Sequence, residues 1–227
     1  MFERFTQQYT VTSRLSTGSP GAIVMSPLEN TPGYEDFMRE YAGATFNEGV
    51  YRVHSLEARA SWTRLVEQAY PMYRGQFAVF GCDWLGRQFA LDSQRRENGQ
   101  PRVVMYEPGT GQALEIPATF HGFHDAVLSM ESDAALADVF FQDWLRAGNR
   151  GPRPTECVGY KVPLFLNGED TLDNLELTGM DLYWELTAQL LAQTRGLPAG
   201  TPIRSVEQQL GSKPQASEEE DRIGRRS

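Results

Sequence analysis

Residues 77–92 read Phe-Ala-Val-Phe-Gly-Cys-Asp-Trp-Leu-Gly-Arg-Gln-Phe-Ala-Leu-Asp, and this stretch decides the fold of the chain. Apolar and aromatic residues precede and follow a short polar turn that contains Asp83 and Gly86. Two apolar runs on either side of such a turn predict a pair of β-strands folded into a hairpin. We therefore expect an antiparallel hairpin whose core face is unusually rich in aromatic side chains.

The same pattern returns a short way downstream. Apolar residues from Val103 to Ile116 flank the sequence Glu-Pro-Gly-Thr-Gly at 107–111, which is typical of a turn between two strands. Two hairpins in succession form an antiparallel meander, and its apolar face needs helices to cover it. The predicted fold class is α/β in the broad sense, more narrowly α+β, with a mainly antiparallel sheet flanked by helices.

Helical and strand-like segments surround the two hairpins. The first region, residues 1–74, is expected to form a small αβ module, and the second, residues 75–211, is expected to contain the sheet. Residues 212–227 are poor in apolar side chains and are predicted to be disordered. Helices are expected near residues 2–9, 34–41, 55–70, 120–128, 136–145 and from 181 onward, with short strands at 49–54, 157–166 and 174–178.

Length and cysteine content limit the class of protein. A chain of 227 residues can bury a sizeable core without disulfides or metals. Its two cysteines, Cys82 and Cys157, lie inside apolar segments, which is typical of a reducing compartment. Residues 1–15 mix charged with apolar side chains, so neither export nor membrane insertion is signalled. We expect a cytoplasmic protein with no membrane partner.

Charge points to the class of partner. The formal net charge is −9, and residues 131–181 alone contain ten Asp or Glu against four Lys or Arg. Nucleic acid is bound through clustered Lys and Arg, so direct DNA binding is not expected. Two interpretations of the acidic stretch stay open. It is either a solvated face that keeps the protein in solution or a docking surface for a basic protein.

The residues that could carry chemistry have simpler interpretations. His121 and His124 are spaced to face one way on a helix, but no further ligand nearby completes a zinc set, so a capping or core role is preferred. Cys82 lies in an apolar strand, where a cysteine is usually an inert small hydrophobe. The pair Gly109 and Gly111 lacks the third glycine and the helix of a dinucleotide site. We expect no catalytic residue, no metal and no cofactor.

Several blocks of the sequence resemble a known family. The most specific are FGCDWLGRQF at 80–89, EPGTG at 107–111 and ECVGYKVPLFL at 156–166. These blocks resemble the C-terminal domain of bacterial type VI secretion immunity proteins. Residues 41–52, with Trp62, are similar to the GAD-like domain that precedes it in those proteins. The resemblance extends over roughly residues 30–205.

The resemblance implies a fold and a role. The fold would be similar to the SUKH group, with a GAD-like module at 1–74 and a SUKH-like immunity domain at 75–211. The role would be to bind and neutralise a secreted toxin, most often a DNase with a basic cleft, so that the producing cell survives. The family supplies no catalytic residues. The expected toxin contacts are acidic or aromatic loop residues: Asp83, Trp84, Glu169, Asp170, Asp173 and Glu176.

Three alternatives remain at this stage. The chain could be a cytoplasmic adaptor of the same fold with a partner that is not a toxin. It could be a small hydrolase that uses Cys82 or the pair His121 and His124. For Trp84 itself, a core anchor is the alternative to a toxin contact.

Overall fold

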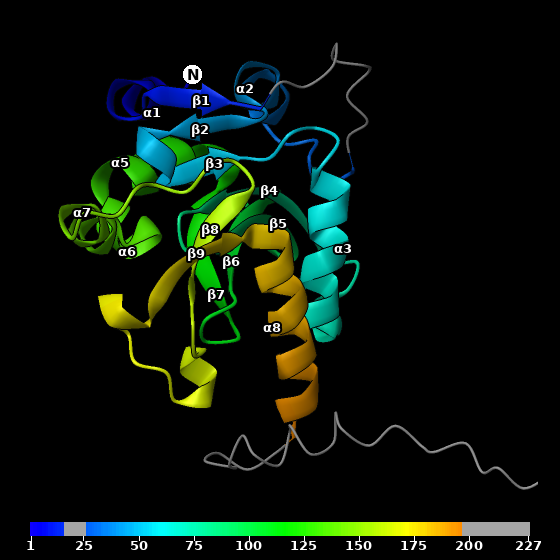
Figure 1. The fold of residues 1–227 in the computed structure, drawn as a ribbon. Helices are drawn as coiled ribbons and strands as arrows, with labels where there is room; N and C mark the ends of the chain where they lie inside the picture. Colours follow the sequence, from blue (N-terminus) through cyan, green and yellow to red (C-terminus); the bar gives the residue numbers. More distant parts are fainter. Residues whose placement is uncertain (16–25, 197–227) are drawn as a thin grey trace, which may run out of the picture. The chain divides into compact units, whose positions relative to one another are not determined.

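A seven-stranded antiparallel sheet lies at the centre of the fold (Figure 1). We describe it from a computed structural model, in which residues 1–15 and 26–196 are described. Each strand pairs with the next one along the chain, which confirms the predicted antiparallel sheet. The strands are β1 (Val11–Arg14), β2 (Ala44–Phe46), β3 (Tyr51–Val53), β4 (Phe77–Asp83), β5 (Gln88–Glu97), β6 (Gln100–Glu107) and β7 (Gln112–Thr119).

Both predicted hairpins are present. In the first, Phe77 faces Asp92 and Cys82 faces Gln88, so the polar turn at 84–87 joins β4 to β5. In the second, β6 pairs with β7 through the turn at 108–111. The hairpins are adjacent because β5 also pairs with β6, and together these strands form the longest part of the sheet.

The sheet continues across the predicted boundary at residue 74. Strand β3 pairs with β4, so that Tyr51 faces Asp83 and Val53 faces Gly81. The described residues up to Arg195 form one compact unit, to which both predicted regions contribute strands. The predicted tail at 212–227 lies outside the described residues.

Helices cover both faces of the sheet, as Figure 1 shows. On one face, α3 (Arg59–Ala69) and α8 (Met180–Thr194) lie against each other and against the sheet. The other face is covered by α1 (Glu3–Gln8), α2 (Tyr34–Tyr41), the helical stretch α4–η3–α5 (Phe120–Gly122, Phe123–Val127, Leu128–Met130), α6 (Ser132–Leu136) and α7 (Asp138–Arg146). None of the helices in the described part of the chain is long and apolar enough to cross a lipid bilayer.

Alternation along the strands divides the interior into two cores. In β6, Val103 and Met105 belong to the core under α1, α2 and α4–α7, whereas Val104 and Tyr106 belong to the core under α3 and α8. Successive side chains of a strand point to opposite faces, so a strand buried on both sides reads as a continuous apolar run. The first core is highly aromatic, as the sequence predicts.

A separate two-stranded ribbon completes the fold. It consists of β8 (Glu156–Tyr160) and β9 (Leu175–Gly179), which pair in antiparallel register from Glu156–Gly179 to Tyr160–Leu175. Val158 N–H donates to Trp84 O at 2.8 Å, which attaches the ribbon to the β4–β5 turn. The connection between the two strands contains η4 (Leu164–Leu166) and η5 (Leu172–Asn174). It carries most of the acidic residues predicted to contact a partner.

Candidate functional site

The candidate site is the acidic loop, which we define as residues 167–176, from the end of η4 to the start of β9. Its four carboxylates are exposed to solvent, and none of them forms an ion pair with another described residue. They are Glu169, Asp170, Asp173 and Glu176. An exposed cluster of one sign, without internal ion pairs, attracts an oppositely charged partner.

Asn174 holds the backbone of the acidic loop. Its Nδ2 donates to Val162 O at 2.9 Å and to Glu169 O at 2.8 Å, and its Oδ1 accepts from Val162 N–H at 2.9 Å. One side chain thereby links the two ends of the connection between β8 and β9. These hydrogen bonds hold the loop in one backbone arrangement. The loop therefore loses less conformational entropy when it binds a partner.

The neighbours of Asn174 reinforce this arrangement. Tyr160 Oη donates to Asp170 Oδ1 at 2.7 Å. Burial raises the pKa of the Tyr160 phenol, and the bond to Asp170 raises it further, so Tyr160 remains a donor at neutral pH. Lys161 Nζ donates to Asp173 O at 2.8 Å, which directs the lysine to backbone and leaves the Asp173 carboxylate free of an ion pair.

Apolar side chains border the acidic loop. Val162 is 42% exposed, and the side chains of Leu164, Phe165, Leu166 and Leu172 are half-buried. A partly exposed apolar group with charged residues around it is typical of a protein–protein interface, where an apolar centre is surrounded by a polar rim. The composition of this surface therefore fits contact with a protein.

Gly168 offers a test of how rigid the acidic loop is. A Cβ at this position would lie 1.9 Å from Val162 O and 2.9 Å from Asn174 Nδ2. We expect Gly168→Ala to displace the Asn174 contacts and to lower the free energy of unfolding by about 2 kcal/mol. Urea denaturation measures the loss. Gly122→Ala is the control, since its nearest neighbour would be 3.4 Å away; equal stability of the two variants would show that the loop adapts freely.

Asp83 and Trp84, which the sequence analysis places among the toxin contacts, lie in the interior. Asp83 accepts from Arg87 Nε at 2.5 Å and from Arg87 N–H at 3.0 Å, and its side chain is fully buried. Burial raises the pKa of Asp83, and Arg87 opposes this shift. Trp84 is also fully buried, and its Nε1 donates to Leu136 O at 2.8 Å. The structure therefore agrees with the alternative interpretation, in which Trp84 anchors the core.

The two histidines of the predicted helix face different environments. His124 is fully buried; its Nδ1 lies 2.9 Å from Phe120 O and its Nε2 lies 2.8 Å from the Tyr51 hydroxyl. Because a carbonyl only accepts, Nδ1 carries the proton and Nε2 accepts from Tyr51. His121 bonds instead to Met1 O. Within residues 1–15 and 26–196, no group of three or more His, Cys, Asp or Glu is placed to hold a metal ion.

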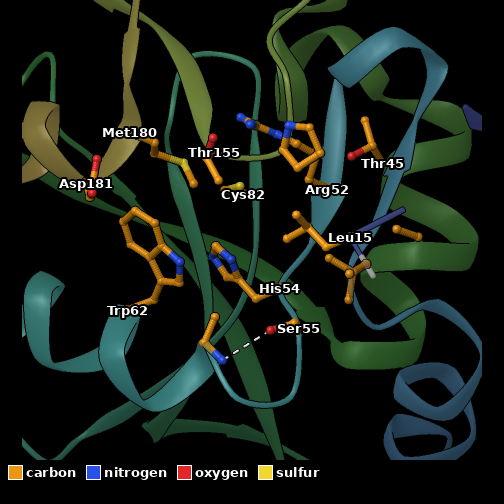
Figure 2. A pocket seen from close by; sticks show the side chains of 15 residues that line it. Leu15, Thr45, Arg52, His54, Ser55, Trp62, Cys82, Thr155, Met180 and Asp181 are labelled. Carbon is orange, nitrogen blue, oxygen red and sulfur yellow. Dashed lines mark hydrogen bonds between the residues drawn. The ribbon is translucent and has the colours of Figure 1, made fainter. Parts of the chain in front are cut away.

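Cys82 lies beside a cavity of about 160 Å³, shown in Figure 2. His54, from the segment after β3, lines the same cavity. Burial raises the pKa of Cys82 to about 11 and lowers that of His54 to about 4. A nucleophilic cysteine needs the opposite shifts, a thiolate beside an imidazolium. At neutral pH these two side chains are a neutral thiol and a neutral imidazole.

Sequence reasoning did not identify the role of Asn174 or the presence of the cavity, although it considered Cys82, which lines the cavity. Asn174 has no signal of its own, because its function depends on a backbone turn closed by Gly168. The cavity brings Asp181 close to Arg52 and His54, from which it is far away in the sequence. Exposure of the acidic loop, in contrast, could be predicted from its composition alone.

Comparison with known proteins bears on the fold. No protein-family model matches the chain, and no curated protein matches it in sequence. Among solved structures, the fold is similar to the crystal structure of Atu4351 from Agrobacterium tumefaciens, with a TM-score of 0.58 and 15% sequence identity. The match covers 83% of this chain and 89% of that chain. The chain thus has an α+β fold, an antiparallel sheet flanked by helices, that is similar to the fold of Atu4351.

Proposed function

We propose that this protein is an immunity protein, which binds a toxic effector of a type VI secretion system and neutralises it. The effector would be a nuclease, most often a DNase, whose substrate cleft is basic because it binds a polyanion. The observation that carries the proposal is the acidic loop, in which four exposed carboxylates without ion pairs lie on an ordered backbone. The sequence blocks at 80–89 and 156–166 support the same assignment through their resemblance to immunity proteins.

The mechanism is competition by stoichiometric binding. Carboxylates of the acidic loop would occupy or border the basic cleft where the phosphates of nucleic acid bind, and the bordering apolar side chains would exclude water from the contact. This requires no bond-making step by the immunity protein. The complementary charges would also accelerate encounter between the two proteins, and salt would slow it.

Charge reversal in the acidic loop tests this directly. We expect the triple variant Glu169→Lys, Asp170→Lys and Asp173→Lys to bind the nuclease at least about a hundredfold more weakly, because a basic cleft would then face three like charges. Surface plasmon resonance at several salt concentrations measures affinity and association rate. Survival of cells that co-express the nuclease is the functional readout.

A matched variant separates the loop from net charge. Glu40, Glu57 and Glu185 are exposed and lie on α2, on the turn before α3 and on α8. Reversing these three changes the net charge by the same amount and should leave capture close to wild type. Equal loss in both triple variants would contradict the loop assignment. In a second contrary outcome, cells stop growing with every candidate nuclease even when they co-express this protein, and no complex forms. That outcome would contradict immunity and favour the adaptor alternative.

A further inference from the structure

The cavity beside Cys82 is built from elements that are distant in sequence. Its lining comes from β2, β3, the start of α3, β4, the segment before β8 and the start of α8. Its volume of about 160 Å³ is several times the space of one water molecule. Figure 2 shows Arg52, His54 and Trp62 around it, with Asp181 at its side.

Arg52 places an unbalanced positive charge beside the cavity. Its side chain is 3% exposed and donates to three backbone carbonyls, those of Asp83, Arg153 and Glu156. No carboxylate of the described residues forms an ion pair with it, and its Nε–H is buried without a partner. The nearby carboxylate of Asp83 is already paired with Arg87. A buried cation in this situation is stabilised by an anion close by.

His54 adds a hydrogen-bond acceptor to the same cavity. Its Nε2 lies 2.7 Å from Gln88 Oε1, and Gln88 Nε2 donates to Gly86 O, so the amide presents its oxygen to the imidazole. The proton of His54 is therefore on Nε2, and Nδ1 keeps a lone pair. The Trp62 ring stacks on the imidazole at 5.1 Å and keeps it in place.

The remaining polar groups have mixed character. Ser55, Thr45 and Thr155 contribute hydroxyl groups to the lining, and Asp181 contributes a carboxylate at the start of α8. Asp181 Oδ1 accepts from Leu182 N–H at 2.8 Å. A ligand that suits this set carries negative charge for Arg52 and also at least one proton to donate, because His54 Nδ1 and Asp181 can only accept.

We propose that the cavity binds a small oxyanion that retains a proton at neutral pH, namely inorganic phosphate. Phosphate keeps a proton on oxygen at neutral pH and can donate it to Nδ1 or to Asp181 while its other oxygens accept from hydroxyls. Sulfate has the same shape but no proton to give. The cavity therefore discriminates between the two anions, and this site is independent of the acidic loop.

The test uses the wild-type chain labelled with ¹⁵N in its three histidines. Inorganic phosphate, titrated at constant ionic strength, should move the His54 Nδ1 resonance in a saturable way and leave the buried His124 resonances in place. Sulfate should bind about tenfold or more weakly. Methyl phosphate has a second pKa of about 6 and is mostly unprotonated at neutral pH, so it should bind more weakly than inorganic phosphate. Equal binding of the two would contradict the role of the phosphate proton.

Two conservative variants make the proposal falsifiable. Asp181→Asn should reduce the preference for phosphate over sulfate about tenfold, since an amide can donate to either anion. Glu185→Gln on the same helix removes the same charge outside the cavity and should leave the preference unchanged. A flat titration of His54 with phosphate, or equal affinity for sulfate in the wild-type chain, would overturn the proposal.

Discussion

Replacing Trp84 with alanine is expected to lower the free energy of unfolding by about 4 kcal/mol. The indole is fully buried, and it lies 5.1 Å from the Phe141 ring and 5.6 Å from the Phe140 ring, measured between ring centroids. Removing it leaves a large cavity between the β4–β5 turn and α7, and it leaves Leu136 O without its donor. Guanidinium denaturation followed by circular dichroism measures the loss.

Trp84→Phe separates packing from hydrogen bonding. This variant keeps an aromatic ring and loses the Nε1–H bond to Leu136 O, so we expect a smaller loss of about 2 kcal/mol. Neither variant should change the affinity of the folded protein for the proposed nuclease partner, because the side chain does not reach the surface. If Trp84→Phe had wild-type stability but bound the nuclease poorly, the result would support a direct contact between Trp84 and the nuclease.

The second large effect is expected from acid. Burial lowers the pKa of His54 to about 4 and that of His124 to about 3, whereas both histidines titrate near the ordinary value of 6.5 once unfolded. Below pH 6.5, therefore, both imidazoles take up a proton in the unfolded chain, whereas both stay neutral in the folded chain. Stability is fully present above pH 6.5 and falls with decreasing pH, by about 1.4 kcal/mol per histidine for each pH unit.

The measurement is a series of urea denaturation curves between pH 7.5 and 5, above the range where carboxylates take up protons. A slope close to two protons is expected for the wild type. His124→Gln should be less stable at pH 7.5, since it loses the Tyr51 and Phe120 contacts, but its stability should depend on pH with a slope of only one proton. His121→Gln controls for loss of a surface histidine. A flat wild-type profile would show that neither imidazole is held neutral.

Sequence reasoning reached the parts of the fold that depend on local patterns. The two hairpins and α2 follow from alternating apolar residues, turn glycines and helical spacing, and they lie where the sequence predicts. Strands β1 and β2 were not predicted. β2 has only three residues, and β1 is exposed throughout, so neither shows an apolar alternation. Their place in the sheet depends on pairing with distant segments, which no local pattern records.

The site was predicted in part for the same reason. Charge alone marks the acidic loop, because unpaired carboxylates in a polar segment favour solvent. Asp83 has the same composition signal, yet it is buried, since Arg87 folds back on it four residues later and α6 covers the turn through Ala135 O. Tertiary packing decides whether an acidic turn faces water or an arginine. Local sequence patterns do not contain that information.

The junction between β3 and β4 links the evolution of the two halves of the chain. Three facing pairs join these strands, and Arg52 in the middle of β3 also bonds to the carbonyls of Arg153 and Glu156. A substitution in β3 at this junction alters the packing of β4, and a substitution in β4 alters that of β3. Recombination that exchanges residues before 74 between homologous genes would therefore succeed only among sequences that have diverged in step along this junction.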